Sequence, residues 1–293
     1  MKLLFTILLA ILFIPSTTLS DPTNQDEKEP ATAHQMENKW IVHADLVGFI
    51  NPLGVAAFAG GLFRHPYDYS ERFEMVWSHI QAGAYLGVNP AYAQLAAHME
   101  WMPILPIQLH LEYDHFRYFA NFGALLSFDS PDAHFGDEVQ KERKGEEELG
   151  NAHRVLFRPI LKAMVGPVVI RNVTDLAFYH FDGEGPYFFE WEYETLLEKN
   201  DMIVLNRTEV MLQAWSGGAS AVFLIGPYYE ITHAVLTEVQ RQRVGGLFLW
   251  IPSDSLGALG QLRVFAQFGA NMQDRNRKNE FYTLFGVGSD WTL

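Results

Sequence analysis

Hydrophobic and polar residues alternate along much of this chain, in segments that turn residues such as glycine, proline and asparagine separate. A β-strand places alternate residues on opposite faces of a sheet, so this period predicts strands rather than helices. In 187–197 the polar positions are Glu190, Glu192 and Glu194, and aromatic residues occupy the positions between them. In 79–89 one face carries Ile80, Ala82, Ala84, Leu86 and Val88, and the other carries His79, Gln81, Gly83 and Asn89.

The length of these segments distinguishes between two all-β architectures. Strands of a soluble β-sandwich average about five or six residues. The segments here are about twice as long, which matches tilted strands that cross a lipid bilayer. Many tyrosine and tryptophan residues fit the aromatic girdles of such proteins. We therefore predict an all-β fold, a transmembrane antiparallel up-and-down β-barrel, with a soluble all-β protein as the alternative.

Thirteen segments fit the strand pattern, whereas bacterial single-chain barrels have an even number of strands. One assignment must therefore be wrong, and we predict 12 strands, with 14 as the next choice. The stretches 54–88 and 219–252 are the assignments most open to revision. The segments are 40–50, 54–66, 72–88, 91–102, 106–119, 152–165, 167–180, 186–197, 202–215, 219–231, 242–252, 260–272 and 280–293.

Composition narrows the choice further. Hydrophobic residues make up 48% of the chain, yet beyond the N-terminal region no apolar run is long enough for a membrane-spanning helix. The formal net charge of -14 argues against a nucleic-acid partner. The chain has 0 cysteines, so neither disulfides nor a lipid-bearing cysteine contribute to its stability or anchoring.

The two ends and one long connection define the predicted organisation. Residues 1–20 have a charged start, a short apolar stretch and small residues, as in a cleavable signal peptide. The polar, acidic 21–38 is predicted to be a flexible periplasmic tail, followed by the barrel over 39–293. Long loops lie outside the cell, so we place 120–151 at the surface and the turn at 103–106 in the periplasm. A solvated loop is the preferred interpretation of 120–151, and folding of its apolar patch 122–128 into the lumen is the alternative.

The last eight residues carry a resemblance. Gly286, Gly288, Trp291 and Leu293 resemble the C-terminal signal by which the outer-membrane assembly machinery recognises barrel proteins, although phenylalanine is more usual than leucine at the end. The resemblance implies a bacterial outer-membrane β-barrel, placed among outer-membrane lipids and inserted by that machinery. It covers the assembly signal alone and implies no specific family.

If the apolar faces contact lipid, the polar faces line the lumen. A hairpin turn near 104–105 would set Glu100 opposite His110 and His98 opposite Glu112. Arg154, Arg158 and Lys162 would meet Glu112 and Asp114, because opposed unlike charges stabilise a sheet. Treated as a strand, 186–197 would lie between Arg171 on one side and Arg207 on the other. The predicted lumen-facing residues are His98, Glu100, His110, Glu112, Asp114, Arg154, Arg158, Lys162, Arg171, Glu190, Glu192, Glu194, Arg207 and Glu209.

Four functions are compatible with these residues. The first is passive passage of small polar solutes or ions through a charged lumen. The second is a non-conducting structural or surface-interaction barrel whose paired charges fill the interior. A third treats His98, Glu100, His110 and Glu112 as metal ligands, which a simple His–Glu hydrogen bond explains equally well. A lipid-modifying or peptide-cleaving enzyme is the fourth, but no serine–histidine pair shares a strand face, and no catalytic residue is assigned. We predict the pore, with no cofactor and no metal.

Overall fold

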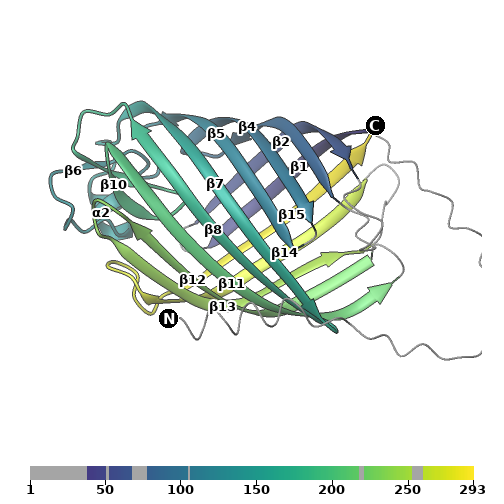
Figure 1. Cartoon of the computed structure of the whole chain (residues 1–293). Coiled ribbons are helices and arrows are strands. Elements are labelled where there is room, and N and C mark those ends of the chain that lie inside the picture. Colours follow the sequence, from purple (N-terminus) through teal and green to yellow (C-terminus); the bar gives the residue numbers. More distant parts are fainter. Residues whose placement is uncertain (1–37, 51–52, 68–77, 105, 218–220, 253–259) are drawn as a thin grey trace, which may run out of the picture.

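The computed structural model describes residues 38–293 except 51–52, 68–77, 105, 218–220 and 253–259. Twelve antiparallel strands form a closed barrel, in which each strand pairs with its neighbours and the last strand pairs with the first (Figure 1). Closure satisfies the backbone groups of every strand edge, as a lipid environment requires. The strands are β1 (Lys39–Ile50), β2 (Gly54–Pro66), β3 (His79–Val88), β4 (Tyr92–Ile104), β5 (Ile107–Phe119), β7 (Leu149–Val165), β8 (Val168–Phe181), β11 (Asn200–Gly217), β12 (Ala221–Ala234), β13 (Gln240–Ile251), β14 (Gln261–Gln273) and β15 (Phe281–Thr292).

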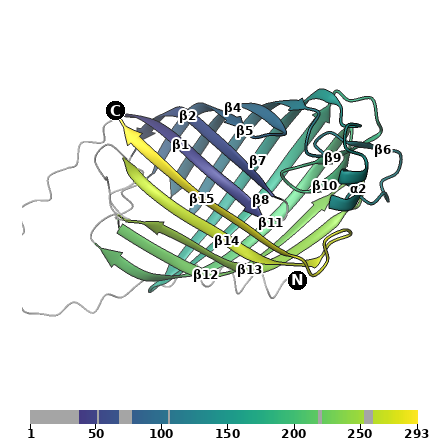
Figure 2. The same ribbon diagram turned by 180° about the vertical axis from the view of Figure 1, so that it is seen from behind.

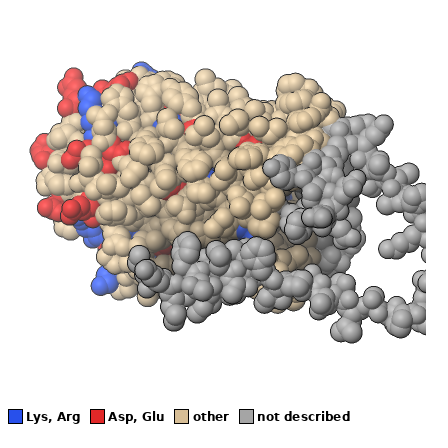
Figure 3. Space-filling model, viewed as in Figure 1, with Lys and Arg blue, Asp and Glu red and all other residues tan. Residues whose placement is uncertain are grey.

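The outer wall of the barrel is apolar. Alternation along β5 leaves Leu111 and Tyr113 nearly half exposed, while Glu112 and Asp114 between them are buried. Strand β15 behaves in the same way, with Phe281 and Phe285 exposed. On the face seen in Figure 3 the uncovered wall is almost free of charged side chains, and acidic and basic residues gather at the left-hand end. An apolar outer surface of this kind is suited to contact with lipid chains.

One of the thirteen predicted strands is not part of the wall. Segment 186–197 instead forms a short hairpin of β9 (Tyr187–Glu190) and β10 (Thr195–Glu198), which lies inside the barrel. Strand β8 pairs directly with β11, as in the pairing of Arg171 with Glu209. The predicted placement of 186–197 between these strands is therefore wrong. The stretches 54–88 and 219–252 do supply four wall strands, β2, β3, β12 and β13, although the assigned 72–77 and 219–220 lie outside the described residues.

The two ends of the barrel differ. The N-terminus of β1 and the C-terminus of β15 lie at one end, called here the terminal end (Figure 2). The opposite end, called the loop end, carries the long connection 120–148 with β6 (Ser127–Phe128) and α2 (Asp137–Glu142), together with the β9–β10 hairpin. Among the described residues, no helix is long and apolar enough to cross a membrane. The predicted signal peptide and most of the predicted tail lie outside the described residues.

Candidate functional site in the barrel interior

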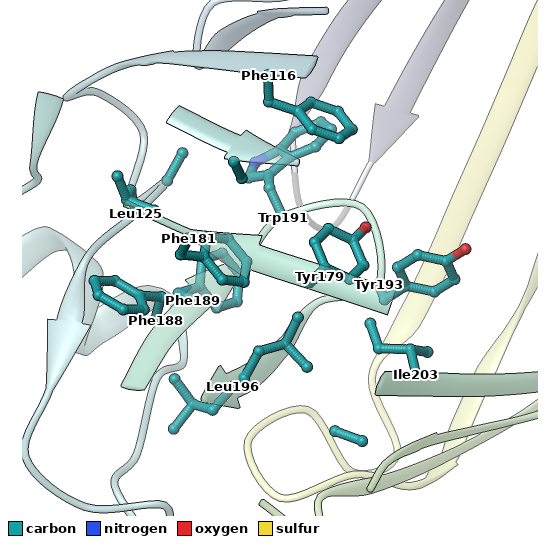
Figure 4. Packing of buried hydrophobic residues seen from close by; sticks show 14 of the residues in the cluster. Phe116, Leu125, Tyr179, Phe181, Phe188, Phe189, Trp191, Tyr193, Leu196 and Ile203 are labelled. Carbon is teal, nitrogen blue, oxygen red and sulfur yellow. The ribbon is translucent and has the colours of Figure 1, made fainter. Parts of the chain in front are cut away.

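A hydrophobic cluster fills part of the barrel at the loop end. The β9–β10 hairpin places Phe188, Leu196 and Leu197 there with no exposed surface (Figure 4). Inward-facing residues of the wall, including Phe116 and Phe181, pack against them. The backbone can approach the ring of Phe188 this closely because Gly183 has no side chain. A Cβ added at Gly183 would clash with that ring. Together 122–128 and 187–198 form what we call the plug.

The apolar patch of the long connection belongs to this plug. Leu125 and Leu126 are fully buried, and Phe189 exchanges backbone hydrogen bonds with both of them. Strand β6 also pairs with β9, so the two segments share a three-stranded sheet. The preferred expectation of a solvated loop is therefore wrong for 122–128, because burying this apolar run removes it from water. Phe122 itself remains exposed.

Arg154 of β7 joins the plug to the wall. Its Nε atom donates to Asp114 Oδ2 at 2.6 Å, and its Nη2 atom lies 3.2 Å from Glu112 Oε1. Its Nη1 atom pairs with Glu192 of the hairpin, and Glu192 Oε1 also accepts a hydrogen bond from Tyr92 Oη at 2.6 Å. Arg154, Glu112 and Asp114 are all buried, so the ion pairs provide the compensation that buried charges require.

A second buried charge network surrounds Glu194. The Oε2 atom of Glu194 lies 2.9 Å from Arg243 Nη2, 3.6 Å from Arg241 Nη1 and 3.7 Å from Arg277 Nη1. Arg241 also donates to the backbone carbonyl of Tyr193 at 2.6 Å. Glu194 has a φ of 48°, which helps the chain reverse between β9 and β10. This network therefore holds the turn of the hairpin.

Two carboxyl groups of the plug have shifted pKa values. Burial raises the pKa of Glu190 to about 7, and the nearby charge of Glu192 adds to this effect. Burial also disfavours the charged form of Glu194, but the guanidinium groups of Arg243, Arg241 and Arg277 outweigh it and hold that pKa below its usual value. Glu194 is thus a fixed negative charge, whereas Glu190 titrates near neutral pH.

The barrel interior contains cavities beside the plug and between the plug and the terminal end. A cavity of about 400 Å³ extends from Phe49 and Trp191, near the loop end, to the Arg158–Asp175 pair. A second cavity of about 300 Å³ continues towards Glu100 and Arg171. The two adjoin because they share the lining residues His110, Arg158, Asp175, Leu205 and Arg207.

The register predicted between β4 and β5 is present in the structure. His98 pairs with Glu112, and Glu100 pairs with His110, across the two strands. The rings of His98 and His110 are stacked with centroids 5.6 Å apart, and His110 Nε2 lies 3.2 Å from Glu112 Oε2. Glu100 accepts one hydrogen bond from Gln108 and lies 3.1 Å from His79 Nε2. Within the described part of the chain, no group of three or more histidine, cysteine, aspartate or glutamate side chains is arranged so that it could hold a metal ion.

The remaining predicted residues have partly different partners from those expected. Of the three basic residues expected to meet Glu112 and Asp114, only Arg154 does so. Arg158 makes two contacts with Asp175, at 2.5 and 2.9 Å, and Lys162 donates to Gln108. Arg171 and Arg207 both pair with Glu209, at 3.2 and 2.8 Å.

Several important charged residues were not selected from the sequence. Arg241, Arg243 and Arg277 lie on or beside β13 and β14, and Glu230 of β12 contacts the first two. The inward alternation of Arg241 and Arg243 on β13 was a usable signal. Their partner Glu194 was not predictable in this way, because it reaches them only when the hairpin folds into the lumen.

The residues of the predicted assembly signal lie on the closing strand. Gly286 and Gly288 of β15 pair with β1 and β14, and Leu293 is largely exposed. A Cβ at Gly288 would meet Asp45 Oδ1, so a side chain at this position would displace the Asp45 carboxylate from its inward pair with Arg263. Recognition of these residues by the assembly machinery stays a prediction.

Comparison with known proteins yields similar structures but no sequence family. No family model and no curated protein matches the chain. The beta domain of the Bordetella autotransporter Brka aligns with a TM-score of 0.48 and 8% identity, covering 86% of this chain and 98% of that one. An outer membrane channel from Pseudomonas putida F1 aligns with a TM-score of 0.41 and 9% identity, covering 90% and 100%. LpxR from Salmonella typhimurium aligns with a TM-score of 0.37 and 8% identity, covering 85% and 99%.

The class of the protein follows from its own architecture. The wall is closed, its outer face is apolar, and its ionic residues face inward, which is the reverse of a soluble protein. The chain is an outer-membrane β-barrel of twelve strands.

Proposed function

We propose that the barrel is a narrow pore for small polar solutes or ions, and that the passage runs beside the plug. The supporting observation is the pair of adjoining cavities, which together extend along much of the barrel interior. Their walls carry charges of both signs in pairs, such as Arg158 with Asp175. Because these charges largely compensate one another, we expect weak discrimination between cations and anions.

We place the constriction of the proposed pathway where the two cavities meet. Leu205 of β11 lines both of them and is buried, with 7% of its surface exposed. The adjacent residue Val204 belongs to the opposite, lipid-facing set of the same strand. These two positions provide a matched test, because the same substitution adds bulk to the passage at one position and to the lipid face at the other.

Conductance across a planar bilayer tests this proposal. We expect discrete steps from the wild-type protein, much smaller steps from Leu205→Trp, and unchanged steps from Val204→Trp. Each variant must first show the shift in gel migration upon heating that distinguishes folded barrels. Silence from a folded and inserted wild-type protein would refute the pore.

A non-conducting barrel is the second candidate, and the fully buried cluster at the loop end favours it. Removing the hairpin distinguishes the two. The backbone N–H of Phe181 donates to the carbonyl of Lys199 at 2.9 Å, so a four-residue Gly-Ser turn can replace 183–198 without moving β8 or β11. If the wild type is silent and this variant conducts, the plug closes the barrel. If the wild type already conducts, the variant should conduct several times more.

A further inference from the structure

Three histidines form a row on the outer surface of the barrel, outside the interior site. His115 of β5 pairs with His153 of β7, and His153 pairs with His180 of β8. Their ring centroids are 4.9 and 6.3 Å apart. The preceding residues on β5 and β8, Asp114 and Tyr179, are buried, so alternation directs the imidazoles outward.

The row lies near the ends of its strands, at the loop end. Further along the same outer faces, towards the terminal end, Tyr113, Val155 and Phe178 are exposed. These residues continue the apolar wall described above, and beyond the row the outer face carries the pair Arg117–Asn151 before the exposed pair Phe119–Leu149. We therefore place the histidines at the level where the hydrocarbon layer meets polar headgroups. Outward-facing polar side chains at this level meet lipid headgroups.

Hydrogen bonds hold the row in a defined geometry. His153 Nδ1 lies 2.8 Å from Tyr113 Oη, which leaves the Nε2 atom of His153 directed away from that bond. His180 Nδ1 lies 2.6 Å from Asn200 Oδ1, and His180 Nε2 lies 3.4 Å from Asp182. The carboxylate of Asp182 is thus already paired with the last histidine of the row, and it also accepts a hydrogen bond from Asn151.

An arginine completes the patch. Arg117 lies two residues beyond His115 on the same outer face of β5, is exposed, and pairs with Asn151 of β7. It donates a hydrogen bond to Asn151 Oδ1 at 3.2 Å. Among the described residues, no carboxylate lies within ion-pair distance of Arg117. Guanidinium and imidazole N–H groups are well suited to phosphate oxygens, for which arginine offers two parallel donors.

We propose that His115, His153 and Arg117 bind the phosphate of an outer-leaflet lipid headgroup, and that His180 borders this site. The loop end faces the outer leaflet because long loops lie outside the cell. The site would fix the barrel relative to the membrane surface and to particular lipids. It does not depend on whether the interior conducts.

Lipid retention in native mass spectrometry tests the proposal. The purified full-length mature protein is mixed in detergent with phosphatidic acid or with phosphatidylcholine of the same chains. We expect the wild type to retain about tenfold more phosphatidic acid than phosphatidylcholine. This ratio is the effect expected from one charge-assisted contact. His115→Gln with His153→Gln, and separately Arg117→Gln, should remove this preference. His233→Gln is the matched control, because His233 lies between the buried Thr232 and Ala234 on β12 and so also faces outward, but it lies outside the row.

Three results would overturn the proposal. The first is equal retention of the two lipids by the wild type, and the second is an unchanged preference in both folded variants. The third is loss of phosphatidic acid upon addition of millimolar inorganic phosphate, which would assign the site to a soluble anion. A preference that is present in the His233 variant and absent from the other two would support the lipid site.

Discussion

Arg154 provides the sharpest test of how the plug is attached to the barrel. Its guanidinium group contacts Glu112, Asp114 and Glu192, and the first two carboxylates are 6% and 0% exposed. Arg154→Gln would leave these two charges buried without their cation. Breaking a buried ion pair costs about 3–5 kcal/mol. We apply this cost once to the whole network, because contacts that share a partner are not additive.

Urea titration of the protein in micelles, followed by tryptophan fluorescence, measures this loss. We expect the free energy of unfolding of Arg154→Gln to fall by about 3–5 kcal/mol. Arg117→Gln is the matched control: its side chain is exposed, and loss of a surface contact costs at most about 1 kcal/mol. Arg154→Met combined with Glu112→Gln and Asp114→Asn should recover much of the stability, because all three charges are then absent.

A particular outcome would refute this reasoning. If Arg154→Gln lies within about 1 kcal/mol of the wild type, water must reach the two carboxylates and the network is not a dry attachment. If the triple variant is less stable than Arg154→Gln alone, the destabilisation comes from lost packing and not from the unpaired charges.

Three further predictions concern the plug and the wall. Glu190 has a raised pKa in the folded protein, so its contribution to stability is complete below about pH 4.5 and is lost as the pH rises through about 7. The urea midpoint of the wild type should therefore fall more between pH 5 and pH 8 than that of Glu190→Gln, and parallel curves would contradict this. Phe188→Ala leaves a cavity in the plug and should cost about 3–5 kcal/mol by the same titration, whereas a loss below about 1 kcal/mol would mean that the cluster collapses to fill it. Gly226→Ala on β12 would place a Cβ 1.9 Å from the backbone oxygen of Val210, so we expect a reduced yield of folded barrel on gels, and a normal yield would contradict the close strand contact.

The wall was predictable because each strand repeats one physical contrast between lipid outside and charge inside. The same contrast misled the assignment of 186–197. There, aromatic residues and glutamates also alternate, but both sets are buried, as Phe189 and Glu190 show. An alternating pattern indicates that the two faces of a segment lie in different environments, but it does not show whether those environments are lipid, lumen or a packed interior. Phe188 on the glutamate face was the available warning, because a lumen-facing ladder has little use for a phenylalanine between charges.

Interior pairing was predictable where the chain reverses nearby, and the opposition of unlike charges also predicted Arg154 beside Glu112 and Asp114 across the long connection. The short connection between β4 and β5 fixes their register, and so the cross-strand pairs His98–Glu112 and Glu100–His110 could be foreseen, although the hydrogen bonds of Glu100 are made with His79 and Gln108. Arg158 is on β7, which lies between β5 and β8. The sequence pattern does not indicate whether Arg158 pairs with Asp175 of β8 or with Asp114 of β5. The contacts of Glu192 and Glu194 depend on how the hairpin folds into the barrel, which no local pattern encodes.

The plug and the wall are held together by different forces, which bears on how the protein could open. Within the described residues, the hairpin belongs to a separate three-stranded sheet with β6, and the wall strands satisfy their backbone groups among themselves. Undocking the plug would therefore break side-chain contacts and the ion pairs of Arg154 and Glu194, but not the ladders of the wall. Such an opening costs less than global unfolding. Amide exchange should consequently be faster in β9 and β10 than in β8 and β11, and uniform protection would mean that plug and wall form one cooperative unit.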